Sequence, residues 1–265
     1  MKAEIRTYKE GCLEMDYAVF GHGKKSFIIL PGMSVCSVMG SAGAVASAYS
    51  SFCEEYTVYL FDRKKNIEEG YSVLAMADDT FLAMEGLGIG EADIFGASQG
   101  GMIALALAVL HPEKVRRLAL ASSLARQNSR SAATFAEWER LSREGLKQQL
   151  NRDIFKKVYS PAFHSRYEKA LAMFEDNGSP EDLRRFAILS KASGEFDIFG
   201  NLCLVSCPVY AAGAEDDTVL SGCGMREIAE ILDCELHTYP GSGHAVYDED
   251  KEFPEKLLEF FRKSI

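Results

Sequence analysis

One short stretch of the chain, Gly-Ala-Ser-Gln-Gly-Gly at residues 96–101, combines a hydroxyl group with flanking glycines. It follows a short apolar run typical of a strand and precedes a long apolar run typical of a buried helix. In that setting Gly-x-Ser-x-Gly predicts a nucleophile elbow, a sharp turn that holds Ser98 in a strained conformation. Gly96 and Gly100 would avoid collisions with the neighbouring strand and helix. The pattern therefore indicates Ser98 as a nucleophile.

Two other interpretations of this stretch compete. The first is a glycine-rich turn without chemistry, and the second is a degraded dinucleotide loop, Gly96-x-Ser98-x-x-Gly101. A dinucleotide loop requires an acidic residue about 20 positions later, at the end of the next strand. Residues 116–121 read Arg-Arg-Leu-Ala-Leu-Ala and contain no acid. The loop also lies after several strands rather than after the first, which disfavours dinucleotide binding.

A serine nucleophile needs a base, which is usually a histidine held by a carboxylate. Of the five histidines, His244 stands in a glycine-rich loop between the last expected strand and the last expected helix. In a parallel sheet this loop lies at the carboxyl edge, as does Ser98. His237 falls inside a strand and His111 at a helix end, so His244 is the predicted base.

The acid is expected in the loop that follows the preceding strand. Asp216 stands three residues after Gly213, at the tip of a strand expected over 208–212. The spacing between Asp216 and His244 leaves room for one helix and one strand, so their loops can be neighbours. Asp216 is the predicted acid, with Glu215 and Asp217 as local alternatives. The order Ser, Asp, His is the one found in this type of sheet.

Acyl transfer also requires hydrogen-bond donors for the developing oxyanion. The backbone N–H of Gln99, directly after the nucleophile, is one predicted donor. The N–H of Met33 is the other, because residues 31–34 form a tight turn after a buried strand.

The elements that position these residues follow from apolar periodicity and turn signals. Strands and helices alternate, which predicts an α/β fold with a mostly parallel sheet covered by helices on both faces. Residues 124–199 show helical patterns only and are interpreted as an insertion between two strands. Strands are expected over 5–8, 13–20, 26–30, 57–61, 92–95, 115–122, 208–212 and 235–239, and helices over 40–52, 72–87, 99–110, 225–232 and 253–263.

Composition restricts the possible partners. The chain has 265 residues, 47% of them apolar, and a net charge of −10, which disfavours general binding of nucleic acid. The longest apolar run, Met102 to Leu110, is about half the length of a membrane span, and residues 1–11 show no secretory signal. Seven scattered cysteines without a Cys-x-x-Cys pair are typical of reduced thiols in a cytoplasmic protein. We expect a small-molecule substrate, no nucleic-acid or membrane partner, and leave the oligomeric state open.

With these residues in these positions, the chain resembles the α/β-hydrolase family over nearly its whole length outside residues 124–199. Besides GASQGG, the matching stretches are FIILPGM (27–33), the segment 71–98, HPEKVRRLALASS (111–123), VYAAGAEDDTV (209–219), YPGSGHAVYDED (239–250) and FPEKLLEFF (253–261). The resemblance implies an eight-stranded sheet, with residues 1–123 and 200–265 as the core and 124–199 as a helical cap after the sixth strand. It also implies Ser98, Asp216 and His244 as the catalytic triad.

Two departures from the family pattern are visible. Pro31-Gly32 replaces a common His-Gly, and the segment from Asp62 to Ser72 lacks the first glycines of a common Asp-x-Arg-Gly-x-Gly-x-Ser. The oxyanion donor is a backbone group, so the first change leaves the donor in place. The second affects the shape of that loop.

The resemblance implies a serine hydrolase that cleaves a small or medium carboxylic ester through an acyl-enzyme, with no metal or cofactor. Cleavage of an amide, a thioester or a carbon–carbon bond by the same residues is an alternative, and a non-catalytic ligand-binding or receptor protein is another. Serine at position 98 argues against the branches that use an aspartate nucleophile. Most aromatic residues of 124–199 are expected to pack between its own helices.

Overall fold

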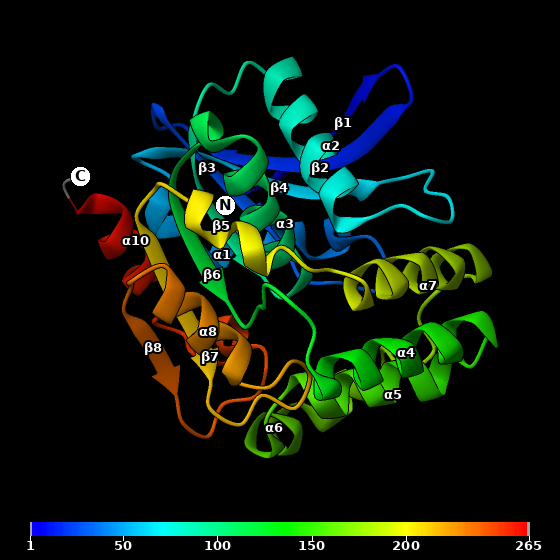
Figure 1. Cartoon of the computed structure of the whole chain (residues 1–265). Coiled ribbons are helices and arrows are strands. Elements are labelled where there is room, and N and C mark those ends of the chain that lie inside the picture. Colours follow the sequence, from blue (N-terminus) through cyan, green and yellow to red (C-terminus); the bar gives the residue numbers. More distant parts are fainter. Residues whose placement is uncertain (1, 264–265) are drawn as a thin grey trace.

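A single eight-stranded sheet organises the chain. The computed structural model describes residues 2–263 (Figure 1). The spatial order of the strands is β1-β2-β4-β3-β5-β6-β7-β8. The strands are β1 (Glu4–Glu10), β2 (Leu13–Gly21), β3 (Lys25–Leu30), β4 (Tyr56–Lys64), β5 (Ala92–Ala97), β6 (Val115–Ala121), β7 (Val209–Ala214) and β8 (Leu236–Tyr239).

The sheet is mostly parallel. Strands β1, β2 and β4 pair antiparallel, whereas β4, β3, β5, β6, β7 and β8 pair parallel in that order. Across the centre, Ala97 pairs with Ala121, and Ala121 pairs with Ala212, so β5, β6 and β7 end close together. This alignment confirms the predicted fold class and brings three chain segments to one edge.

Helices cover both faces, as the alternation of elements predicts. The first face carries α1 and α10, which pack with Phe27, Phe52 and Phe261. The opposite face carries α2, α3 and α8, in a core that includes Met84, Leu105 and Ile228. The helices are α1 (Ala42–Ala48), α2 (Val73–Gly86), α3 (Gln99–Leu110), α4 (Ser129–Arg143), α5 (Lys147–Val158), α6 (Pro161–Ala172), α7 (Pro180–Gly194), α8 (Cys223–Ile231), α9 (Val246–Glu249) and α10 (Phe253–Arg262), with short 3₁₀ turns η1 (Val38–Ser41), η2 (Ser50–Phe52), η3 (Pro112–Lys114) and η4 (Phe199–Leu204).

Local sequence explains two of the helices that lead to the edge. The hydroxyl of Ser72 accepts a hydrogen bond of 3.2 Å from the N–H of Ala75, which caps α2 as expected. Helix α3 begins at Gln99 and ends at Leu110, and almost all of its residues are buried. An all-apolar helix of this kind is stable only inside the molecule, against the sheet.

Helices α4 to α7 form the helical insertion, residues 129–194, between β6 and β7. Figure 1 shows these four helices together on one side of the sheet. Asn128 caps α4 and Ser179 caps α7, each in a reciprocal capping box. The rings of Phe135, Trp138 and Phe186 pack against one another inside the insertion, as expected for aromatic residues of this segment. The division into a core domain and a cap domain stays a prediction.

None of the helices among residues 2–263 is both long enough and apolar enough to span a membrane.

Candidate active site

The turn between β5 and α3 has the geometry of a nucleophile elbow. Ser98 has φ 53° and ψ −120°, a backbone conformation that residues other than glycine rarely adopt. Its N–H donates to the carbonyl of Ala121 at 2.9 Å, which fixes the turn to the neighbouring strand. A Cβ atom at Gly96 would overlap the backbone of Gly100, and one at Gly100 would overlap the carbonyl of Leu30. The predicted strain and the predicted need for glycine are therefore both present.

A carboxylate and an imidazole meet at the same edge. Nδ1 of His244 lies 2.7 Å from Oδ2 of Asp217, and the two residues are 2% and 4% exposed. The carboxylate paired with His244 is thus that of Asp217 and not that of the predicted acid, Asp216, whose side chain is exposed. Asp217 was one of the two local alternatives to Asp216.

Strand length explains why Asp217 rather than Asp216 is paired with His244. The expected strand ended at residue 212, but β7 continues to Ala214. The exposed turn that follows contains Glu215 and Asp216, so Asp217 is the first acid to turn back into the protein. Its Oδ1 accepts hydrogen bonds from the N–H groups of Val219 at 2.7 Å and Leu220 at 2.9 Å. An Asp side chain that accepts from the backbone N–H two residues later forms an Asx turn, and the Asp-Thr sequence at 217–218 is compatible with such a turn.

The surroundings of Asp217 favour its ionised form. Burial raises its pKa, but the His244 ring and the N–H groups of Leu220 and Val219 outweigh burial and lower the pKa below the ordinary value of 3.8. A carboxylate only accepts hydrogen bonds, so Nδ1 of His244 carries the proton in this pair. Within residues 2–263 the other nitrogen, Nε2, has no hydrogen-bond partner, which leaves its lone pair available as a base.

Ser98 lies at the same sheet edge as this pair, without a direct hydrogen bond to it among residues 2–263. In the described part of the chain, no hydrogen bond connects the Ser98 hydroxyl to the His244 ring. The position of Tyr247, three residues after His244, shows how close the histidine loop comes to Ser98. Its hydroxyl oxygen and Ser98 Cβ both lie 3.4 Å from the point where a Gly32 Cβ would stand. The histidine loop therefore reaches the elbow. Catalytic hydrogen bonds are often long or absent before substrate binds.

The two predicted oxyanion donors flank the serine. Gln99 is the first residue of α3, so its N–H has no partner inside the helix. Among residues 2–263, neither this N–H nor that of Met33 donates a hydrogen bond to another group. Because a Cβ at Gly32 would stand 3.4 Å from Ser98 Cβ, the loop that carries Met33 lies directly against the elbow. Their role as oxyanion donors stays a prediction.

A buried arginine connects the parts of the site, which the sequence analysis missed. Arg63 donates to the carbonyl of Pro31 at 2.6 Å and to the Gln99 side chain at 3.1 Å. The Gln99 amide in turn donates to the Ser193 hydroxyl at 2.7 Å, in α7. Burial lowers the pKa of Arg63 to about 10. Arg63 belongs to the segment that departs from the family pattern, and it ties the oxyanion loop to the elbow.

Two other histidines lie away from this edge, as expected. His111 stacks on Phe81 with ring centroids 3.9 Å apart, and its Nε2 lies 3.0 Å from Asp78. The ring of His237 stacks on Tyr210 at 4.5 Å. Both have structural partners, so His244 is the histidine that the fold brings towards Ser98.

Comparison with known proteins agrees with this geometry. The sequence pattern of the α/β-hydrolase fold family matches residues 46–251. The chain belongs to the α/β-hydrolase fold family. The match spans the elbow, the acid loop and the histidine loop of this α/β-hydrolase.

Relatives of this α/β-hydrolase carry names of different hydrolases. A 2-hydroxy-6-oxononadienedioate/2-hydroxy-6-oxononatrienedioate hydrolase of Pseudomonas sp. is 27% identical over 263 residues, which cover 88% of this chain and 89% of that protein. RutD of Caulobacter sp. (strain K31), named as a candidate carbamate hydrolase, is 27% identical over 77% of this chain and 80% of its own length. The enol-lactonase from Burkholderia xenovorans LB400 is 19% identical with a TM-score of 0.85, covering 97% of this chain and all of that chain. Family and names together support hydrolysis as the general activity.

In this α/β-hydrolase, the junction between α5 and α6 is bonded to both loops of the acid–base pair. The Thr218 hydroxyl donates to the carbonyl of Lys157 at 2.5 Å, and the N–H of Ala245 donates to the carbonyl of Val158 at 3.0 Å. Ser160 donates to the Glu249 carboxylate from its N–H at 2.7 Å and its hydroxyl at 2.6 Å. We call residues 157–160 the junction segment. It connects the helical insertion to the loops that carry Asp217 and His244.

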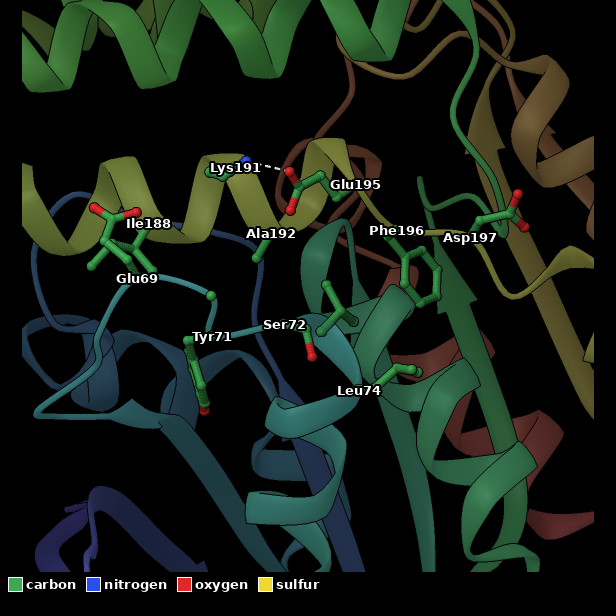
Figure 2. Close-up of a pocket in the computed structure, with 12 residues that line it drawn as sticks. Glu69, Tyr71, Ser72, Leu74, Ile188, Lys191, Ala192, Glu195, Phe196 and Asp197 are labelled. Atoms are coloured by element: carbon green, nitrogen blue, oxygen red, sulfur yellow. Dashed lines mark hydrogen bonds and ion pairs between the residues drawn. The ribbon is translucent and has the colours of Figure 1, made fainter.

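A hollow at the helical insertion lies apart from the edge of this α/β-hydrolase. A cavity of about 110 Å³ lies between the end of α7 and the segment that leads into α2. Figure 2 shows the residues that line it. Its lining includes Tyr71, Ala192 and Phe196, and Lys191 pairs with Glu195 at its rim. It is lined by none of Ser98, Asp217 and His244, so it is a separate feature.

Proposed function

We propose that the protein is a serine hydrolase of small or medium carboxylic esters, which acts through an acyl-enzyme on Ser98. One observation carries the proposal: the strained elbow serine lies at the same edge as a buried imidazole held by a carboxylate. In the proposed triad Ser98 is the nucleophile, His244 the base and Asp217 the acid.

The proposed reaction begins when substrate enters and the Ser98 hydroxyl turns towards Nε2 of His244. Nε2 takes the hydroxyl proton as Oγ attacks the carbonyl carbon, and the carbonyl oxygen becomes an oxyanion near the N–H groups of Met33 and Gln99. The imidazolium returns the proton to the departing alkoxide, which leaves as an alcohol. Water then attacks the acyl-enzyme by the same sequence and releases the acid. Asp217 holds the tautomer of the ring and stabilises its charged form.

Cleavage of a bond other than a carboxylic ester by the same residues stays the alternative. The relative named for carbamate hydrolysis supports testing carbamates beside esters, because a carbamate carbonyl can accept the same attack. Amide, thioester and carbon–carbon substrates complete the set. Leaving-group preference depends on the shape of the pocket, which varies on a shared fold.

The test combines turnover with labelling of the nucleophile. Wild-type protein should hydrolyse short-chain p-nitrophenyl esters with a burst, and a fluorophosphonate should add to the peptide that contains Ser98. Ser98→Ala should abolish both. Ser122→Ala is the matched control, because Ser122 is also a buried serine at the sheet edge with a positive φ of 47°. Equal turnover in wild type and Ser98→Ala would remove Ser98 as the nucleophile. Absence of an adduct together with absence of turnover would favour a binding protein.

A further inference from the structure

A tyrosine that the proposed triad does not use lies beside the predicted oxyanion loop. Tyr247 belongs to the short helix α9, directly after the histidine loop. Its hydroxyl oxygen lies 3.4 Å from the point where a Cβ of Gly32 would stand, and Ser98 Cβ lies at the same distance from that point. The two atoms are therefore no more than twice that distance apart, which is within the span of a bound acyl group.

The ring of Tyr247 is held so that its hydroxyl can act on a bound group. It packs edge-on against Phe95 of β5, with centroids 6.2 Å apart, and Phe95 is 2% exposed. Strand β5 leads into the elbow, so the tyrosine and the serine share one rigid support. Over residues 2–263 the Tyr247 hydroxyl has no hydrogen-bond partner. The Tyr247 hydroxyl and the N–H groups of Met33 and Gln99 are thus three donors without a partner in the described part of the chain, and the hydroxyl lies beside Gly32, next to Met33.

We propose that the Tyr247 hydroxyl donates a hydrogen bond to the oxyanion that forms on the substrate carbonyl, as a third donor beside the N–H groups of Met33 and Gln99. This inference rests on the proposed function. The phenol donates without losing its proton, so no proton transfer is added to the reaction. The donor acts on the carbonyl oxygen and not on the departing group.

The electrostatics of the site agree with a neutral donor. Burial and the nearby Asp248 raise the pKa of Tyr247 well above its ordinary value, and Asp217 adds to this effect. The hydroxyl therefore keeps its proton at neutral pH and can donate it in a hydrogen bond.

The test removes only the hydroxyl. Tyr247→Phe should lower kcat for p-nitrophenyl acetate by about tenfold or more, since single oxyanion donors contribute factors of about 10²–10³. KM should change little, and ethyl and p-nitrophenyl esters of one acid should lose the same factor. Tyr210→Phe is the matched control, because it removes a buried tyrosine hydroxyl on the same face of the sheet, where Tyr210 packs beside Phe260 of α10 and His237 of β8. Equal unfolding temperatures of the two variants would exclude a general loss of fold.

Three outcomes would overturn the inference: an unchanged kcat, an effect on KM alone, or a loss confined to the ethyl ester. The last would place the hydrogen bond on the leaving group. The rate of fluorophosphonate labelling at Ser98 provides a second measurement that needs no turnover, and Tyr247→Phe should slow it. Failure of the proposed function is a separate result, because it appears as unlabelled Ser98 in the wild-type protein.

Discussion

Asp217 and His244 are 27 residues apart in the chain, yet Oδ2 of the first lies 2.7 Å from Nδ1 of the second. Both side chains are nearly inaccessible to solvent, and the other carboxylate oxygen is occupied by backbone N–H groups of Val219 and Leu220. The carboxylate is thus held in place by the backbone as well as by the ring. The side chain of the neighbouring Asp216 is exposed, so the two acids should respond very differently to substitution.

Replacement of the buried acid should disable catalysis. We expect Asp217→Asn to lower kcat for a p-nitrophenyl ester by about 10²–10⁴, because the amide no longer favours the correct imidazole tautomer. Asp216→Asn should keep kcat within about twofold, since its side chain is exposed. Steady-state kinetics of both variants measure this difference. The reverse order of the two losses would return the acid to Asp216.

The same pair should make stability depend on pH. The folded protein holds the pKa of Asp217 below the ordinary value of 3.8, so ionised Asp217 stabilises the fold above that pH. This contribution should be lost as pH falls from 3.8 through the lower, folded value. We expect the difference in free energy of unfolding between wild type and Asp217→Asn to be constant at neutral pH and to shrink below about pH 4. Urea unfolding from pH 7 to pH 3 measures it, and a difference that grows towards acid would contradict the assignment.

The Gln99 side chain should contribute to stability as well as to position. Gln99→Leu removes the acceptor of the buried Arg63 Nε and the bond to Ser193. Leaving a buried cation without one partner should lower the free energy of unfolding by about 3 kcal/mol. Gln127→Leu is the control, because it breaks a bond of 2.7 Å from a half-buried amide to the Ser193 carbonyl and leaves no cation unpaired. Its loss should be nearer 1 kcal/mol. Equal losses in urea unfolding would show that Arg63 does not depend on Gln99.

Replacement by alanine should change the free energy of unfolding in opposite directions at two glycines. Gly100→Ala places a methyl group against the Leu30 carbonyl and should cost about 3 kcal/mol or more. Gly43 lies on the exposed side of α1, and no atom of residues 2–263 outside its own helix backbone lies within 4 Å of the methyl group that Gly43→Ala would add. This substitution should raise the free energy of unfolding by about 0.5–1 kcal/mol, since alanine favours helices. Thermal unfolding distinguishes them, and a neutral Gly100→Ala would mean that the elbow can open.

The local sequence pattern was sufficient to predict the elements around the elbow. The helix expected over 99–110 is observed with those bounds, because an apolar run between a glycine turn and His111-Pro112 has clear limits. The helix expected over 40–52 is instead divided into η1, α1 and η2. Glycine and serine, which favour helices weakly, occupy much of that segment. Without strong apolar periodicity, helix propensity alone did not determine where the helix in this segment begins and ends.

The site was predictable only in part, for a related reason. Ser98 and His244 follow from glycine-rich turns that sequence displays directly. The choice between Asp216 and Asp217 depends on where β7 ends, and strand ends shift by two residues with little local signal. The roles of Arg63 and Tyr247 depend on contacts with Pro31, Gln99 and Gly32, far away in the chain. Such contacts exist only after the sheet has formed.

The junction segment, residues 157–160, has a mechanical consequence. It is hydrogen-bonded to Thr218, next to the acid, and to Ala245, next to the base. If the α5–α6 corner lifts to admit a molecule, these bonds must break or carry their loops with them. Movement of the α5–α6 corner is therefore coupled to the loops of the acid–base pair, because any displacement must either cost these hydrogen bonds or shift the backbone beside Asp217 and His244.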